Sequence, residues 1–425
     1  MGYINMKKFN KEKYLKKLRF KKYKRYLYIG IPCILVLLIG IYFAYSKFSV
    51  SKEEDVVRTT VGDFIYGDIV VGAYIDGKYS TTIPGKNDGY KVDKIVCDTD
   101  ATASWDNNSW GIVLTNLTKR TKCNVYFVGK PVSVVKKVTT AMSNNPSMFA
   151  TDDPDNNIRY IGANPNNYVY FNCSDYNNQT ADTCELWRII GVFNNVTMSN
   201  GKKENLVKII RDDGIGDIAW DSNNVNDWST ATLQQNLNSG TYYTTTLKNN
   251  KTKEMIARVV WNLGGTDGYT STASMFYTAE RGTTVYSGRP TTWTGQIGLM
   301  YPSDYGYATA GGSTTNRSTC LSTVLYNWDG SGVADCKNND YLFKTSYYQW
   351  TLTPFSDTAH AVFYVYSSGI VDYDNASVTY GVRPALFLDS DTEGYGTKVK
   401  AGTGESSDPY QLLYEYRGIH HMELD

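Results

Sequence analysis

The sequence predicts an α+β protein in three parts: an N-terminal single transmembrane helix, a small all-β domain and a larger α+β domain. Three observations predict this fold class. An uncharged run of 21 residues follows a basic leader, and short alternating runs separated by turn-forming residues fill residues 60–128. Residues 168–415 then place amphipathic helical segments between runs rich in aromatic and β-branched residues, which is typical of α+β domains.

The transmembrane prediction depends on the uncharged run between Arg25 and Lys47. At ~1.5 Å per helical residue this run spans roughly 30 Å, the thickness of the hydrocarbon core of a bilayer. A cleaved signal peptide has a shorter apolar core of only ~7–15 residues. We therefore expect residues 26–48 to cross a cell membrane once and to make the lipid bilayer a partner of the chain.

The charge distribution predicts the orientation of that helix. Residues 1–25 hold eleven Lys or Arg and a single acid, Glu12, whereas the rest of the chain has more acidic than basic side chains. Basic flanks favour the cytoplasmic side of a membrane. We expect residues 1–25 to form a cytoplasmic tail and the C-terminal domains to be extracellular.

The cysteines indicate an oxidising compartment. Cys33 lies in the apolar run, and the six remaining cysteines allow fifteen pairings. Their grouping along the sequence favours three local disulfides, which are Cys97–Cys123, Cys173–Cys184 and Cys320–Cys336. Free thiols or a metal site are the alternatives, but no CxxC pair and no cluster of Cys and His supports a metal.

Changes in the residue pattern divide the outer part of the chain into four segments. We predict a small β-sandwich spacer domain, a linker, an α+β domain and a tail, over residues 49–128, 129–167, 168–415 and 416–425 respectively. Within the α+β domain, residues 226–240 suit a helix capped by Asp227 or Ser229. The apolar spacing over residues 251–265 predicts a second helix that stops at Gly264.

Composition argues against several functional classes. The chain has only three histidines, His360, His420 and His421, which disfavours His-rich zinc sites and catalytic triads. No phosphate-binding loop or dinucleotide fingerprint occurs, and no basic stripe predicts a nucleic-acid partner. We find no catalytic motif and expect neither a cofactor nor a metal. Calcium binding by Asp152, Asp153 and Asp155 lacks support because the loop does not have EF-hand spacing.

Five motifs in the second half of the chain carry a resemblance. They are LWRIIGVF (186–193), DWSTATLQQNLN (227–238), IGLMYPSDYGYA (297–308), QWTLTP (349–354) and YGVRPALFL (380–388). The series resembles an uncharacterised family of bacterial surface domains that looks related to the C-type-lectin-like and formylglycine-generating-enzyme-like folds. The resemblance covers just over half the chain and implies a C-type-lectin-like fold for residues 168–415. Because such folds support many unrelated functions, it does not imply an activity.

The resemblance also implies a position for a binding face. In such folds the last strands and their loops contact ligands, and here that segment runs from Trp350 to Arg383. Tyrosine rings give a large contact area, and Asp and Asn can hydrogen-bond sugar hydroxyls. The candidate ligand-binding residues are Trp350, Phe355, Asp357, Tyr364, Tyr366, Asp372, Tyr373, Asp374 and Asn375. Strand alternation nevertheless predicts that half of the residues in this segment point into the core.

The sequence therefore predicts a membrane-anchored surface protein that binds an extracellular glycan or protein, in adhesion or recognition. A structural envelope component without a specific ligand is the alternative. The resemblance leaves a third reading, an oxidoreductase of the formylglycine-generating type that uses Cys320 and Cys336. It also raises the hypothesis that residues 350–380 are a target of a diversity-generating retroelement.

Two groups of charged residues have both a structural and a functional interpretation. The carboxylate pairs Asp212/Asp213 and Asp372/Asp374 could act in glycoside hydrolysis, but solvated turns explain them more simply. Arg188 and Arg383 lie within apolar strand patterns. We expect both arginines to stabilise the scaffold through a nearby acid or backbone carbonyls.

Overall fold

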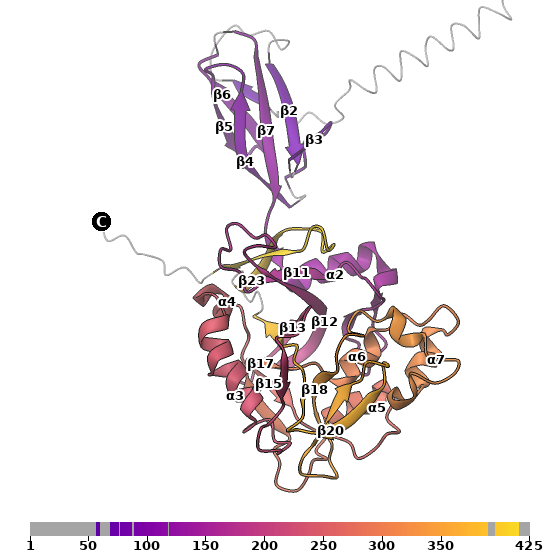
Figure 1. Cartoon of the computed structure of the whole chain (residues 1–425). Coiled ribbons are helices and arrows are strands. Elements are labelled where there is room, and N and C mark those ends of the chain that lie inside the picture. The colour runs from indigo at the N-terminus through magenta and orange to yellow at the C-terminus, as the bar shows by residue number, and fades with distance from the viewer. Residues whose placement is uncertain are drawn as a thin grey trace, which may run out of the picture. The chain divides into compact units, whose positions relative to one another are not determined.

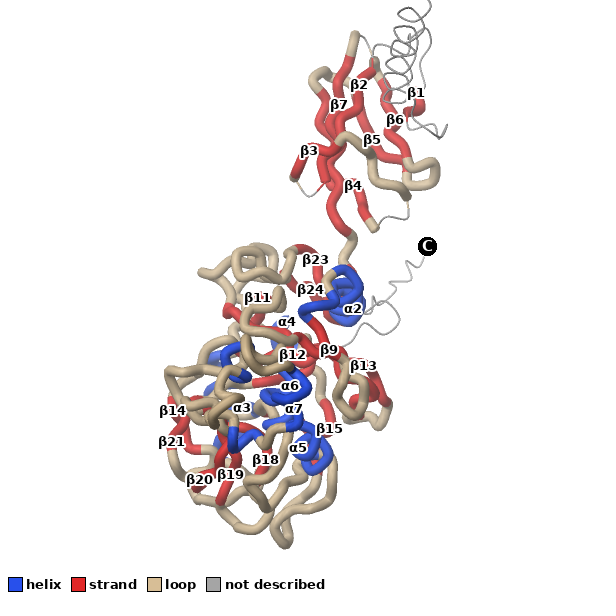
Figure 2. Tube along the Cα trace, turned by 90° about the vertical axis from the view of Figure 1, so that its right-hand side faces the viewer, coloured by secondary structure: helices blue, strands red, loops and turns tan. Residues whose placement is uncertain are grey.

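Figure 1 and Figure 2 show the structure, a computed structural model, which describes residues 57–59, 69–75, 77–86, 89–117, 119–389 and 396–415. The chain divides into two compact units, Met1–Val128 and Gly129–Asp425. Residues 129–167, which the sequence assigns to a linker, therefore belong to the second unit. They contribute α2 (Val134–Asn144), η2 (Pro146–Met148) and strands β8 to β10 to it.

The described part of the first unit contains two sheets. One sheet has the order β3 (Lys78–Ser80), β2 (Ile69–Ile75), β7 (Thr121–Gly129) and β4 (Tyr90–Cys97). The other has the order β1 (Val57–Thr59), β6 (Gly111–Thr115) and β5 (Thr102–Asp106). Alternate residues of β7 are buried, as the period of a strand requires. Cys123, Val125 and Phe127 form the inward face, and the Trp105 ring packs edge-on against Phe127.

The second unit is organised around a seven-stranded sheet. At its centre, β12 (Glu185–Thr197) pairs antiparallel with β13 (Lys203–Arg211). Consecutive residues from Trp187 to Phe193 are buried, so both faces of the central strand are covered. The remaining strands are β17 (Ile297–Gly298), β22 (Ala385–Leu388), β10 (Ile158–Tyr160), β9 (Phe149–Ala150) and β11 (Tyr168–Phe171).

A five-stranded sheet carries most of the predicted binding segment. Its order is β14 (Asp217–Ala219), β21 (Thr379–Gly381), β18 (Gln349–Pro354), β19 (Ala361–Val365) and β20 (Val371–Asn375). The strand β20 is therefore at one edge. Two smaller sheets pair β15 (Val259–Asn262) with β16 (Thr292–Gly295), and join β24 (Gln411–Glu415), β23 (Gly396–Ala401) and β8 (Val132–Ser133).

Short helices flank these sheets in the second unit. In Figure 1, α3 (Thr232–Asn238) and α4 (Asn250–Glu254) lie on one side of the unit. On the other side are α5 (Ala273–Glu280), α6 (Pro302–Ala308) and α7 (Arg317–Ser322). Shorter helical turns are η3 (Tyr242–Thr246), η4 (Leu325–Asn327) and η5 (Cys336–Asn339).

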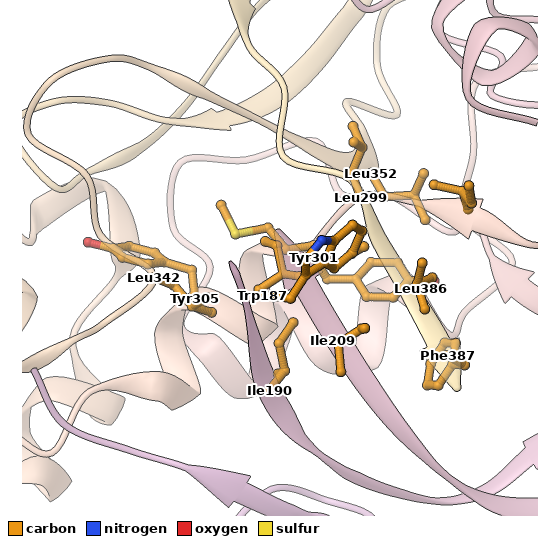
Figure 3. Packing of buried hydrophobic residues seen from close by; sticks show 14 of the residues in the cluster. Trp187, Ile190, Ile209, Leu299, Tyr301, Tyr305, Leu342, Leu352, Leu386 and Phe387 are labelled. Atoms are coloured by element: carbon orange, nitrogen blue, oxygen red, sulfur yellow. The ribbon is translucent and has the colours of Figure 1, made fainter. Parts of the chain in front are cut away.

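One continuous hydrophobic core runs through the second unit. Figure 3 shows Trp187, Ile209 and Leu386, from β12, β13 and β22, meeting Tyr301 from the segment before α6. Trp187 and Ile209 have no exposed surface. The core also explains the glycine in the motif LWRIIGVF, because a Cβ atom at Gly191 would collide with the carbonyl oxygen of Ile158 in β10. Gly191 therefore permits the close approach of β10 to β12.

The predicted fold class needs correction. Strands predominate in the described residues, and their helices are few and short, with the longest, α2, covering 11 residues. None of these helices combines the length and the apolar composition that a membrane crossing requires. Residues 26–48 lie outside the described residues, so the transmembrane helix and the bilayer contact predicted there are not borne out.

The second predicted helix is also wrong. Residues 250–254 form α4, but the chain then enters β15 at Val259. The apolar spacing of residues 255–263 fits a helix, yet the run Val259, Val260 and Trp261 has β-branched and aromatic side chains that favour a strand. The first predicted helix does form, as α3, but its N-cap residue is Ala231 and not Asp227 or Ser229.

Three disulfides join Cys97 to Cys123, Cys173 to Cys184 and Cys320 to Cys336. These are the pairs that the order of the cysteines favours. The last one fixes α7 to η5 and closes a sequence separation of 16 residues. Both of its cysteines are fully buried.

Replacing Cys320 and Cys336 together by Ala is expected to lower the free energy of unfolding by about 3 kcal/mol, because the unfolded chain regains the entropy of an open loop. Urea unfolding without reductant measures the difference. The matched control removes Cys173 and Cys184, whose shorter loop of 11 residues should cost slightly less. Equal stability of wild type and the Cys320/Cys336 variant would contradict this structural role.

Candidate functional site

Three of the predicted ligand-binding residues belong to the core. Trp350, Phe355 and Tyr364 are only 1%, 5% and 5% exposed. The Trp350 indole Nε1 donates a hydrogen bond of 3.0 Å to the carbonyl oxygen of Ile218 in β14. These side chains therefore pack in and beside the five-stranded sheet, and their burial does not fit the predicted direct contact of Trp350, Phe355 and Tyr364 with a ligand.

The other predicted residues reach the surface, but they do not share one face. Asp357 and Asn375 are exposed, and Tyr366, Asp372, Tyr373 and Asp374 are half-buried. In the register of β19 with β20, Tyr364 lies opposite Asp372 and Phe363 lies opposite Tyr373. Because neighbouring residues on a strand point to opposite faces, Tyr373 is on the face away from Asp372 and Asp374.

One face of this sheet carries a group that we call the tyrosine–aspartate cluster, consisting of Tyr348, Tyr364, Tyr366, Tyr380, Asp372 and Asp374. The rings of Tyr348 and Tyr366 stack with their centroids 4.3 Å apart. Tyr380 approaches Tyr348 edge-on at 5.1 Å. The Tyr380 hydroxyl donates a hydrogen bond of 2.6 Å to Asp374 Oδ2. The strands β18, β19, β20 and β21 thus bring together residues that are up to 32 positions apart, from Tyr348 to Tyr380.

Burial and like charge shape the electrostatics of the cluster. Partial burial raises the pKa of Asp372, and the Asp374 carboxylate raises it further, against a hydrogen bond from the Tyr373 backbone N–H. Burial also raises the pKa of Tyr380, and its hydrogen bond to the Asp374 carboxylate acts in the same direction. The cluster therefore combines phenols, which can donate hydrogen bonds, with carboxyl groups whose oxygens can accept them.

A second aromatic group lies on the opposite face of the edge strand β20. Tyr373 stacks on Tyr269 with their centroids 4.8 Å apart and lies 4.0 Å from the Phe355 ring. Tyr269 also contacts Tyr326, at 4.5 Å. Tyr269 and Tyr326 are 42% and 38% exposed. This second group contains no carboxylate of the predicted set, which distinguishes it from the tyrosine–aspartate cluster.

Sequence reasoning missed Tyr348, Tyr269 and Tyr326. The signal for Tyr348 was present, since it lies two residues before Trp350 and strand period places both on one face. Tyr269 comes from a loop about 100 residues before β20, and Tyr326 comes from η4, about 50 residues before it. No local pattern in the sequence indicates that those segments meet this strand.

The acidic turn that could hold calcium is used in internal pairing. Asp153 is buried and accepts a hydrogen bond of 2.5 Å from Arg159 Nε. Asp152 pairs with Arg317 at 2.8 Å, and Asp155 accepts from the Tyr277 hydroxyl at 2.6 Å. In the described part of the chain, no group of three or more His, Cys, Asp or Glu side chains could hold a metal ion.

The two strand arginines have partners within the scaffold. Arg188 donates from Nε to Asn167 Oδ1 at 2.6 Å and lies 3.7 Å from the Asp212 carboxylate. Arg383 donates to Gln349 Oε1 at 2.9 Å and to backbone carbonyl oxygens. Glu185, which is close to Arg188 in the sequence, pairs with Arg211 at 3.2 Å.

The core also contains an ion network that the sequence did not reveal. Asp304 lies at the start of α6, and both of its carboxylate oxygens accept hydrogen bonds. Oδ2 accepts from Lys208 Nζ at 2.6 Å, and Oδ1 accepts from Arg159 Nη1 at 3.0 Å. Arg159 also pairs with Asp153, and the side chains of all four residues are at most 2% exposed. Burial by itself raises the pKa of Asp304, but Lys208 and Arg159 outweigh it and lower the pKa to about 2.

The comparisons with known proteins identify a domain family in one part of the chain. Residues 299–390 match the family described as Domain of unknown function (DUF6273). This stretch, about a fifth of the chain, runs from just before α6 to just after β22 and contains all six residues of the tyrosine–aspartate cluster. No curated protein and no solved structure matches the chain.

Proposed function

We propose that the chain is a binding protein of the extracellular space and that its tyrosine–aspartate cluster recognises a glycan. The observation that carries this proposal is the stacked pair Tyr348 and Tyr366 beside the carboxylate of Asp372. Flat rings can pack against the apolar faces of sugars, while carboxylates and phenols exchange hydrogen bonds with sugar hydroxyls. The cluster supplies both functions within one small area.

A glycan fits this cluster better than a protein does. Protein interfaces bury roughly 800 Å² on each partner, and aspartates are depleted from their centres. The tyrosine–aspartate cluster includes two aspartates, Asp372 and Asp374, among its six residues. Among the described residues of the second unit, the exposed large apolar side chains are Tyr269, Met275 and Tyr326, and none of them belongs to this cluster.

The disulfides support the extracellular location. Three disulfides in one chain are typical of proteins exported from a reducing cytoplasm. We infer a role in adhesion from the proposed glycan binding together with this location. The bonded and buried state of Cys320 and Cys336 favours a structural role for this pair over a reactive thiol.

Replacing Tyr366 by Ala is expected to weaken glycan binding about 10-fold, because the ligand loses a stacking surface worth about 1.4 kcal/mol. The experiment screens the full chain against an array of glycans and cell-wall polymers, then measures the affinity of the bound glycan by calorimetry. Replacing Tyr269 by Ala is the matched control, because it removes an exposed tyrosine from the opposite face. We expect this control to keep the wild-type affinity.

Two results would refute the proposal. If no glycan binds the full chain saturably, the structural envelope role becomes the better account. If a glycan binds but Tyr269→Ala weakens it and Tyr366→Ala does not, the ligand site belongs to the opposite face of β20.

A further inference from the structure

A cavity of about 180 Å³ opens in the second unit, away from the five-stranded sheet. Its floor is aromatic and is formed by Phe193 of β12, Trp261 of β15, Phe387 of β22 and Tyr301. Trp261 lies 5.2 Å from Phe387 and 6.2 Å from Tyr301, measured between ring centroids. Its rim is polar, with Asp155, Thr197, Asn262 and Arg281 among the lining residues.

An irregularity in the longest strand of the second unit shapes one wall. The register of β12 with β13 shifts between Phe193 and Val196, and Asn195 adopts a positive φ of 54°. Asn194 donates from Nδ2 to the carbonyl oxygens of Asp155 and Asn156 at 3.2 and 3.0 Å. Bulges of this kind redirect side chains beside binding sites. These hydrogen bonds fix the position of this wall of the cavity.

The rim places a cation beside a carboxylate. The guanidinium of Arg281 lies 3.4 Å from the centroid of the Tyr277 ring and pairs with Glu280 at 3.2 Å. Its Nε is 3.9 Å from Asp155 Oδ2. The side chains of Arg281 and Asp155 are 24% and 54% exposed, so both can contact a molecule in the cavity. A ligand at this rim meets a hydrogen-bond donor and an acceptor side by side.

Lys208 of the buried ion network also lines the cavity, but its charge is matched within that network. Lys208 lies 4.3 Å from the Tyr301 centroid and 5.1 Å from the Trp261 centroid, but its side chain is fully buried. Its charge and that of Arg159 are matched by Asp304 and Asp153. At the rim, Asp155 repels a simple anion and Arg281 repels a simple cation. A neutral ligand that both donates and accepts hydrogen bonds fits these groups best.

We propose that this cavity binds one neutral sugar ring, with its apolar face on the aromatic floor and its hydroxyls on Asp155 and Arg281. A cavity of roughly 150 Å³ holds one benzene ring, so a cavity of about 180 Å³ has room for one six-membered ring with its hydroxyls at the polar rim. Vicinal hydroxyls can donate to the carboxylate and accept from the guanidinium at the same time. The inference does not depend on the tyrosine–aspartate cluster, which lies in a different sheet.

The test titrates the full chain with free monosaccharides by calorimetry. The panel contains neutral hexoses and N-acetylhexosamines, together with uronic acids and inorganic phosphate as charged competitors. We expect one neutral sugar to saturate the wild type, and Asp155→Asn or Arg281→Gln to weaken it about 10-fold or more through loss of a charged hydrogen bond. Tyr366→Ala should leave this binding unchanged, which separates the cavity from the proposed glycan site.

Thermal unfolding of each variant checks that the fold is intact, and the partial exposure of Asp155 predicts little change for Asp155→Asn. The inference is overturned if no neutral monosaccharide saturates the chain, or if phosphate or a uronic acid binds in preference. It is also overturned if a folded Asp155→Asn variant and a folded Arg281→Gln variant both retain the wild-type affinity.

Discussion

Replacing Asp304 by Asn is expected to lower the free energy of unfolding by about 3–5 kcal/mol, because removing one partner leaves buried charges without compensation. Asp304 is the only carboxylate that Lys208 contacts within hydrogen-bond distance in the described residues, and it also receives Arg159. Asn keeps the size of the side chain and removes its charge. Urea unfolding at neutral pH measures the loss.

The control for this variant is Asp357→Asn, which makes the same chemical change at an exposed position. Surface substitutions of this kind usually stay within about 0.5 kcal/mol of wild type. Equal stabilities of Asp304→Asn and Asp357→Asn would show that the network does not hold the core as the distances imply.

The same carboxylate predicts a pH dependence. The pKa of Asp304 falls from an ordinary value of 3.8 to about 2 in the folded chain. A lowered acid pKa adds stability above the unfolded value, and that stability is lost as the pH falls from about 3.8 toward 2. The contribution at neutral pH is about 2 kcal/mol. In Asp304→Asn this part of the acid-induced loss of stability should disappear.

Replacing Trp350 by Ala is expected to cost about 3–5 kcal/mol of unfolding free energy, because a large cavity replaces a fully packed ring. Trp350 contacts Tyr364 and Tyr380, with ring centroids 6.0 and 4.8 Å away. Its loss should therefore also disturb the tyrosine–aspartate cluster indirectly. Chemical unfolding measures the stability, and near-ultraviolet circular dichroism follows the aromatic packing.

The comparison for Trp350→Ala is Tyr366→Ala, which removes a half-buried ring from the surface of the same sheet. We expect Tyr366→Ala to weaken ligand binding and to have a small effect on the free energy of unfolding. Trp350→Ala should have its main effect on the free energy of unfolding and a smaller, indirect effect on ligand affinity. A Trp350→Ala variant as stable as wild type would mean that the indole is not part of the core.

Local residue patterns account for much of the strand content. The run ELWRIIGVF forms most of β12, and the run NLVKIIRD contains most of β13, because continuous apolar residues suit a strand that is covered on both faces. The run around Val259 led to the wrong prediction of a helix, because its apolar spacing also fits one face of a helix. That ambiguity is resolved only by the pairing of β15 with β16, which lies about 30 residues further along the chain.

Local patterns predicted only part of the candidate site. Segment 350–380 carries five of the six residues of the tyrosine–aspartate cluster, but strand alternation divides the segment between core and surface. Phe363 and Tyr373 face one side while Tyr364 and Asp372 face the other. The cavity could not be predicted because its floor and rim come from distant elements, with Asp155, Trp261 and Phe387 far apart in the sequence. Contacts between such distant segments depend on sheet topology, which local periodicity does not specify.

The most direct measurement of the proposed recognition is footprinting of tyrosines with and without the glycan found by the array. Nitration of the full chain, read by mass spectrometry, reports how accessible each phenol is. We predict that the ligand protects Tyr348, Tyr366 and Tyr380 and leaves the exposed Tyr269 and Tyr326 reactive. Unchanged nitration of Tyr366 at saturating glycan, or protection of Tyr269 instead, would contradict the assignment.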